Sequence, residues 1–147
     1  MKKTVALLLT FVAFMSSVAF ASEIPVVPEK IEQSFKKNFP EVMLFNWEDK
    51  DDLYIAKFRE NEIMNFAYFD SDANLLGVIR YITTDDMPFR IIIALKKKYG
   101  DFNKMNAMEV SLNGGETYYF TGIIHNNKFK TIKIYPDGST EIIKNKF

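Results

Sequence analysis

The stretch VPEKIEQSFKKNFPEV (residues 27–42) is echoed sixty residues later by MPFRIIIALKKKYGDF (residues 87–102). In both, a proline comes early, apolar residues recur every four positions, and lysines follow. The matched positions are Pro28 with Pro88, Ile31 with Ile91, Phe35 with Leu95, Lys36 with Lys96, and Phe39 with Tyr99. A spacing of four places apolar side chains on one stripe of a helix, and proline is tolerated in a first turn. The echo predicts two amphipathic helices, one opening each half of the chain.

The two predicted helices differ on their outer side. Polar residues of the first are replaced by apolar ones in the second, namely Glu29 by Phe89, Glu32 by Ile92 and Gln33 by Ile93. A helix that is apolar around much of its circumference is buried on more than one side, or it presents a patch to a partner. We favour burial against the other half of the chain and keep the patch as the alternative.

After each helix the apolar period changes to two, which is typical of strands. The predicted strands lie near residues 43–47, 53–59, 63–69, 75–83, 104–110, 118–125, 128–135 and 139–144. The connections between them are short, so neighbouring strands are antiparallel. The sequence predicts an α+β fold made of a tandem repeat of two helix-plus-four-strand units, about residues 24–84 and 85–147. The units share one antiparallel sheet with the helices packed on one face.

Residues 1–21 have the pattern of a signal peptide. A basic start precedes an almost wholly apolar run over residues 5–18, and Ala19 and Ala21 supply the small residues that signal peptidase accepts. The rival interpretation is a membrane anchor, but the run is short for a spanning helix. We predict cleavage after Ala21 and a single domain, residues 22–147, that is periplasmic or secreted and not inserted in a membrane.

The composition excludes several classes of function. The whole chain carries 19 basic and 19 acidic residues, and the leader removes two of the lysines, so the mature charge is slightly negative. This argues against nucleic acid or anionic lipid as a partner. The chain has no cysteine and one histidine, His125, so thiol catalysis and zinc sites built from thiolates or several imidazoles are excluded. We predict no cofactor and no catalytic residue.

The mature chain also carries a family pattern. It shows "VP" before a short helix that ends in "FP", then a tryptophan strand, "YIAKF" and "NFAYFDSDANLL". In this it resembles the PepSY-like, beta-lactamase-inhibitor-like proteins of the bacterial cell envelope. The resemblance implies a fold similar to the beta-lactamase inhibitor protein (BLIP), in which the sheet face without helices binds protein. The secreted inhibitor has cysteines, which this chain lacks.

Alternation along residues 53–59 assigns two faces to one strand. Tyr54, Ala56 and Phe58 are all apolar or aromatic, and we predict that they lie under the helices. The opposite set mixes aliphatic and basic side chains, as on a sheet face exposed to solvent. We predict a protein-binding surface there, with Trp47 nearby and extended by Tyr81, Tyr118 and Tyr119, since interfaces favour aromatic and arginine side chains. The predicted site residues are Trp47, Leu53, Ile55, Lys57 and Arg59.

The sequence favours an exported, non-enzymatic module that binds an unknown protein or peptide, with inhibition of that partner left open. Two alternatives concern its acidic loops. The stretch from Asp70 to Asn74 begins like a calcium loop but lacks the glycine and the final glutamate, so a hairpin turn is favoured. The cluster from Glu48 to Asp52 suits solvated charge, with a weak divalent-ion site as the alternative. Calcium or small-ligand binding through either loop stays an alternative function, as does a small hydrolase whose carboxylates the sequence does not place.

Overall fold

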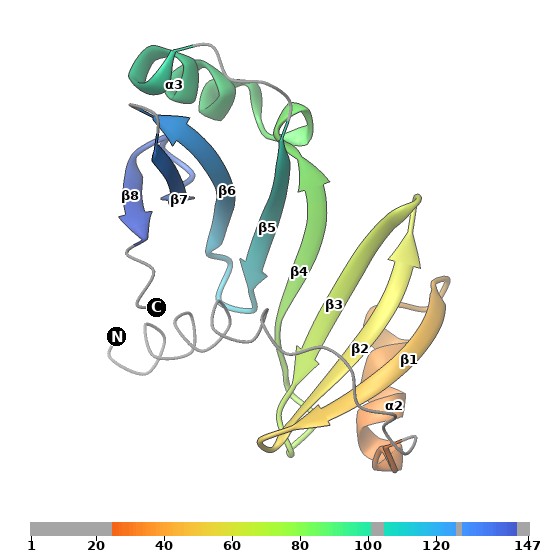
Figure 1. Ribbon diagram of the computed structural model, residues 1–147. Coiled ribbons are helices and arrows are strands. Elements are labelled where there is room, and N and C mark those ends of the chain that lie inside the picture. The colour runs from red at the N-terminus through yellow and green to blue at the C-terminus, as the bar shows by residue number, and fades with distance from the viewer. Residues whose placement is uncertain (1–24, 101–104, 126–127, 144–147) are drawn as a thin grey trace.

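The computed structural model describes residues 25–100, 105–125 and 128–143. Within them the elements follow in the order helix, four strands, short 3-10 helix, helix and four strands (Figure 1). The elements are α2 (Glu29–Asn38), β1 (Met43–Lys50), β2 (Leu53–Glu60), β3 (Ile63–Phe69), β4 (Leu75–Thr83), η2 (Thr84–Asp86), α3 (Phe89–Tyr99), β5 (Asn106–Leu112), β6 (Thr117–His125), β7 (Lys128–Ile134) and β8 (Thr140–Ile143). No helix in these ranges is long and apolar enough to cross a bilayer. Both predicted helices are confirmed, and each begins directly after its proline.

The strands form one antiparallel sheet in which each strand pairs with the next, from β1 at one edge to β8 at the other (Figure 1). Two-residue turns connect β1 to β2 at Asp51–Asp52 and β2 to β3 at Asn61–Glu62, all with positive φ. Turns of this hand match the twist of the flanking strands and keep a hairpin tight. The predicted antiparallel order is confirmed.

β1 extends further than predicted. Glu48, Asp49 and Lys50 pair with Ile55, Tyr54 and Leu53, so these residues belong to the strand and not to the turn. The acidic cluster is therefore divided. Glu48 is a strand residue, and only Asp51 and Asp52 occupy the hairpin tip.

α2 packs on the half of the sheet formed by β1 to β4. Its two buried side chains, Ile31 and Phe35, are at most 4% exposed. They share one apolar cluster with Ala56, Phe58, Ala67 and Phe69 of β2 and β3. The prediction that the Tyr54, Ala56 and Phe58 face lies under a helix is confirmed.

α3 packs on the second half of the sheet. Its additional apolar residues are less buried than the sequence analysis predicts. Ile91 and Leu95 join a cluster with residues of β4 to β7, and Ile92 packs at its margin. Phe89 and Ile93, however, are 76% and 50% exposed. The expectation that the extra apolar residues of α3 are buried is wrong for these two, because they lie on the side of the helix away from the sheet.

Both helices lie on the same face of the sheet. Val78 packs against the cluster under α2, and Ile82 belongs to the cluster under α3. The two residues are four positions apart in β4, and a strand returns to the same face every second residue. The opposite face carries no helix in the described part of the chain. We call it the open face.

Candidate protein-binding face

The open face is assembled from alternate residues of neighbouring strands. Lys57 of β2 lies opposite Phe66 of β3, which lies opposite Ile79 of β4, and the row continues through Val110 of β5 to Tyr118 of β6. Residues opposite one another in an antiparallel sheet share a face and contact each other. A second row runs from Tyr81 through Met108, Phe120 and Lys133 to Glu141.

The centre of the open face is an apolar cluster without a helix above it. Six buried residues from β2 to β6 make it up: Ile55, Tyr68, Ile79, Val110, Leu112 and Phe120. Burial, followed by the nearby Tyr81 and Glu48, raises the pKa of Tyr68 to about 12. The Tyr68 phenol therefore stays neutral at physiological pH and adds no charge to the face.

Lys57 and Arg59 lie at the edge of this cluster, on the β2 side, and each is close to an aromatic ring. The Lys57 ammonium is ion-paired with Glu48 and lies 5.7 Å from the centroid of Phe66. The Arg59 guanidinium lies 5.4 Å from the centroid of Phe45 and 3.7 Å from the Glu62 carboxylate. Contact with an aromatic ring restricts each of these two cationic side chains.

On the β7 side, Lys133 lies between two tyrosines. Its ammonium is 3.8 Å from the centroid of Tyr118 and 4.6 Å from that of Tyr135. The Tyr118 and Tyr135 hydroxyls donate hydrogen bonds to Glu116 (2.8 Å) and Glu141 (2.9 Å). The bond to Glu116, with burial, raises the pKa of Tyr118 to about 12, and burial lowers the pKa of Lys133.

The structure places four of the five predicted site residues together. Leu53, Ile55, Lys57 and Arg59 alternate along β2 on the open face, although Ile55 is only 4% exposed and lies beneath its neighbours. The prediction that Trp47 lies at the open face is wrong. It lies opposite Ala56 and packs edge-on against Phe35 of α2 at 5.5 Å, so it belongs to the helix face.

Of the three tyrosines predicted to extend the site, two lie on the open face. Tyr81 and Tyr118 lie on the open face, whereas Tyr119 belongs to the cluster under α3. Sequence reasoning missed Lys133 and Tyr135. Alternation along residues 129–135 could have placed Lys133 on the open face. Its contact with the Tyr118 ring, however, depends on how β6 pairs with β7.

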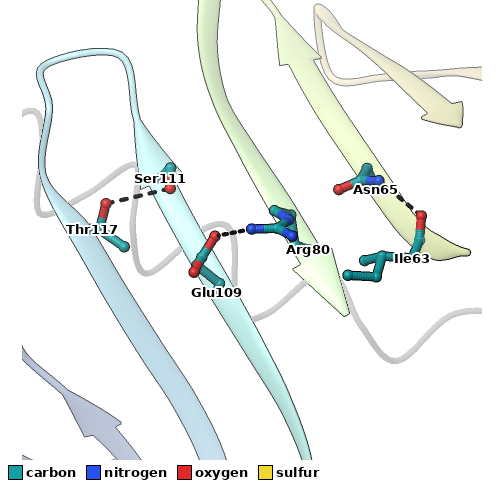
Figure 2. A network of polar contacts seen from close by, with 6 residues as sticks. All are labelled: Ile63, Asn65, Arg80, Glu109, Ser111 and Thr117. Atoms are coloured by element: carbon teal, nitrogen blue, oxygen red, sulfur yellow. Dashed lines mark hydrogen bonds and ion pairs between the residues drawn. The ribbon is translucent and has the colours of Figure 1, made fainter. Parts of the chain in front are cut away.

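The strand register places a polar strip on the helix face, between the two apolar clusters. Figure 2 shows the polar contacts within it. The Arg80 guanidinium donates to the Glu109 carboxylate at 2.9 Å, and Ser111 and Thr117 share a hydrogen bond of 3.3 Å. Asn65, 1% exposed, donates to the Ile63 carbonyl at 2.8 Å. Each of these polar side chains thus has a hydrogen-bond partner, and the buried Asn65 has its partner within its own strand.

A depression of about 320 Å³ opens on this strip beside the start of α3. Glu109 is the one carboxylate among its described lining residues, and it is committed to Arg80. A hydrolase with two converging carboxylates needs a second acid. The described lining does not supply one.

The Asp70 loop is closed by its own hydrogen bonds. Oδ1 of Asp70 accepts from the backbone N–H groups of Asp72 (2.9 Å) and Asn74 (2.8 Å), and Oδ2 accepts from the Asn74 amide (2.9 Å). The carboxylate is thus used within the turn. In the described ranges no three His, Cys, Asp or Glu side chains gather into a possible metal site.

Replacing Asp70 with alanine should destabilise the protein by about 1–2 kcal/mol at pH 7. Slight burial raises the pKa of Asp70, but the hydrogen bonds from Asn74 and Asp72 outweigh it, so the folded pKa lies below the usual value. The stabilisation is therefore complete above the unfolded pKa of about 4 and is lost as the pH falls through the folded pKa. Urea unfolding at pH 7 and pH 3 should show the deficit shrinking in acid. Asp72→Ala, which leaves the acceptors in place, is the control; a deficit independent of pH would contradict the prediction.

The fold and its helix-free face define a class of α+β protein with one antiparallel sheet and helices on one side. No protein-family model matches the chain, and no curated protein does. Solved structures do. A DUF2874 family protein from Bacteroides ovatus is 17% identical, with a TM-score of 0.69 over 80% of this chain and 89% of its own. A BLIP-like protein from Bacteroides fragilis is 18% identical, with a TM-score of 0.69 over 82% of this chain and 89% of its own.

A candidate periplasmic protein from Bacteroides eggerthii is 19% identical, with a TM-score of 0.68 over 82% of this chain and 92% of its own. Likeness at these identities establishes the fold that this chain shares with BLIP-like proteins. The fold does not determine the function, because one fold hosts many functions and the residues of the site differ among them.

Proposed function

We propose that this chain is an exported, non-enzymatic module that binds another protein or peptide through the open face. One observation carries the proposal: apolar and aromatic side chains from five strands share a sheet face without a helix above it in the described chain. Tyrosine, phenylalanine and methionine are enriched at the centres of protein interfaces. The mixture of an apolar centre with charged margins is what a specific interface requires.

The contacting side chains are those at the surface of this face. Leu53, Lys57 and Arg59 contribute from β2, and Phe66 and Tyr81 add an aromatic pair with ring centroids 5.3 Å apart. Tyr118 and Lys133 contribute from the far side. Ile55 supports this surface from below without reaching a partner. Trp47 is left out, because it packs under α2.

The charged margins supply specificity. Lys57 and Lys133 are each held on an aromatic ring and each have a carboxylate nearby, Glu48 for the first and Glu141 for the second. A partner carboxylate that reaches Lys57 competes only with its partly exposed ion pair to Glu48, and such pairs are weak. We infer that the partner presents apolar side chains with acidic residues at their edge.

Crosslinking and co-purification of the tagged protein from its own cell envelope test this proposal. The Lys57→Glu, Arg59→Glu double variant should lose the dominant partner while remaining folded, which circular dichroism checks. The matched control is Lys36→Glu, Lys37→Glu, which makes the same change of charge on exposed positions of α2 and should keep the partner. Equal capture by both double variants would exclude the open face as the binding surface.

The same proposal includes export and an internal repeat. The basic and apolar leader supports cleavage after Ala21, and the fold likeness to a candidate periplasmic protein agrees with a periplasmic or secreted product. The element order supports a tandem repeat within residues 22–147, with units of about 24–84 and 85–147. The quoted sequence pattern supports kinship with PepSY-like proteins.

A further inference from the structure

The outer side of α3 carries exposed apolar residues that its packing on the sheet does not use. Ile91 and Leu95 face the sheet and are at most 1% exposed. Phe89 and Ile93, one turn apart on the opposite side, are 76% and 50% exposed. Lys96 and Lys97 are also exposed and follow on the same side of the helix. We call Phe89, Ile93, Lys96 and Lys97 the outer stripe.

α2 shows that a helix on this sheet does not need such a stripe. Its matched positions are Glu29 and Gln33, and the Gln33 amide donates a hydrogen bond to the Glu29 carboxylate at 2.9 Å. α2 also has acidic residues in its first turn, whereas α3 has none there. The two helices share the inward pattern and differ outward. The exposed apolar side chains of the outer stripe are therefore not required for packing a helix on this sheet.

We propose that the outer stripe docks the protein on an anionic membrane surface. Its centre is apolar and its end is basic, which is the side-chain pattern of helices that lie in the interface of a bilayer. α3 carries four basic residues and no acidic one; Lys96 and Lys97 belong to the outer stripe, whereas the Lys98 ammonium is hydrogen-bonded to Thr140. Like charges on the stripe oppose a second copy of the chain as the occupant. The contact is peripheral and needs no helix that spans the membrane.

The overall charge of the chain does not decide this contact. Charges more than about 8 Å from a surface are largely screened at physiological ionic strength, so the charge of the docking face dominates. Asp85 and Asp86 precede α3, but the basic residues of the outer stripe itself, Lys96 and Lys97, are both exposed, and the stripe has no acidic residue. The outer stripe points away from the sheet, so docking leaves the open face accessible. The two proposals can therefore fail independently.

Vesicle co-sedimentation tests the proposal with the protein purified from its host envelope, in the form that the cell produces. Binding to vesicles of phosphatidylglycerol and phosphatidylcholine should exceed binding to phosphatidylcholine alone by about tenfold or more, and high salt should reverse it. Phe89→Gln, Ile93→Gln should lower the partition coefficient by about tenfold or more. Both residues are exposed, so the thermal unfolding of this variant should be unchanged.

A charge-matched pair of variants separates the stripe from the total charge. Lys96→Gln, Lys97→Gln should reduce binding to the phosphatidylglycerol vesicles strongly, and Lys36→Gln, Lys37→Gln on α2 should leave it within about twofold. Equal losses from the two pairs would overturn the proposal, as would absence of binding to phosphatidylglycerol vesicles. Capture of an acidic protein through the same residues, without vesicle binding, would replace the membrane by a protein partner.

Discussion

Replacing Phe58 with alanine is expected to lower the free energy of unfolding by about 3–5 kcal/mol. The Phe58 side chain is 1% exposed, and its ring contacts Phe35 and Phe39 with centroid distances of 5.4 and 4.7 Å. These contacts join β2 to α2. Truncation removes a buried ring and leaves a cavity between the helix and the sheet, and the rigid strand cannot close it.

Urea unfolding followed by circular dichroism measures this loss. The matched control is Phe45→Ala, because Phe45 lies in the neighbouring β1 and is 50% exposed. Its loss should stay below about 1 kcal/mol. Similar losses for the two variants would mean that α2 does not cover Phe58 in solution.

The second large effect is expected at Gly77, where β4 meets β5. A Cβ atom added there would lie 2.7 Å from the backbone oxygen of Ser111 and 3.3 Å from the Leu112 side chain. A backbone oxygen cannot rotate away as a flexible side chain can. Gly77→Ala should therefore push β4 and β5 apart and lower the free energy of unfolding by about 1–3 kcal/mol.

This position matters because the β4–β5 pair is the seam between the first four strands and the last four. Gly114→Ala is the control, since a Cβ there meets no atom within 4 Å. Unfolding of Gly114→Ala should match that of the unchanged protein. If Gly77→Ala also left the free energy of unfolding unchanged, β4 and β5 would not approach as closely as the structure shows.

Local sequence pattern was enough to predict the helices, the strands and their order. The spacing of Ile31 and Phe35, repeated by Ile91 and Leu95, predicted both helices and their inward sides. Alternation along β2 predicted which side chains lie under α2, because a strand reverses its side chains at every residue. These features depend only on residues close together in the chain.

Trp47 shows where local pattern stops being informative. The pairing of β1 with β2 shifts register between Leu44 and Asn46, and such a bulge changes the direction of the side chains that follow. β1 also lacks a clean alternation of apolar and polar residues. The contact with Phe35 of α2 placed Trp47 on the helix face, and that contact is tertiary.

Long-range packing determines which side chains meet on the open face and which stay exposed on α3. Lys133 reaches Tyr118 because β6 and β7 pair in one register, and no local period encodes that register. Phe89 and Ile93 are as apolar as Ile91 and Leu95, so composition could not separate exposed from buried. Local periodicity fixes the direction of a side chain relative to its own element. Its environment depends on how distant segments pack, and packing is decided by the free energy of the whole fold.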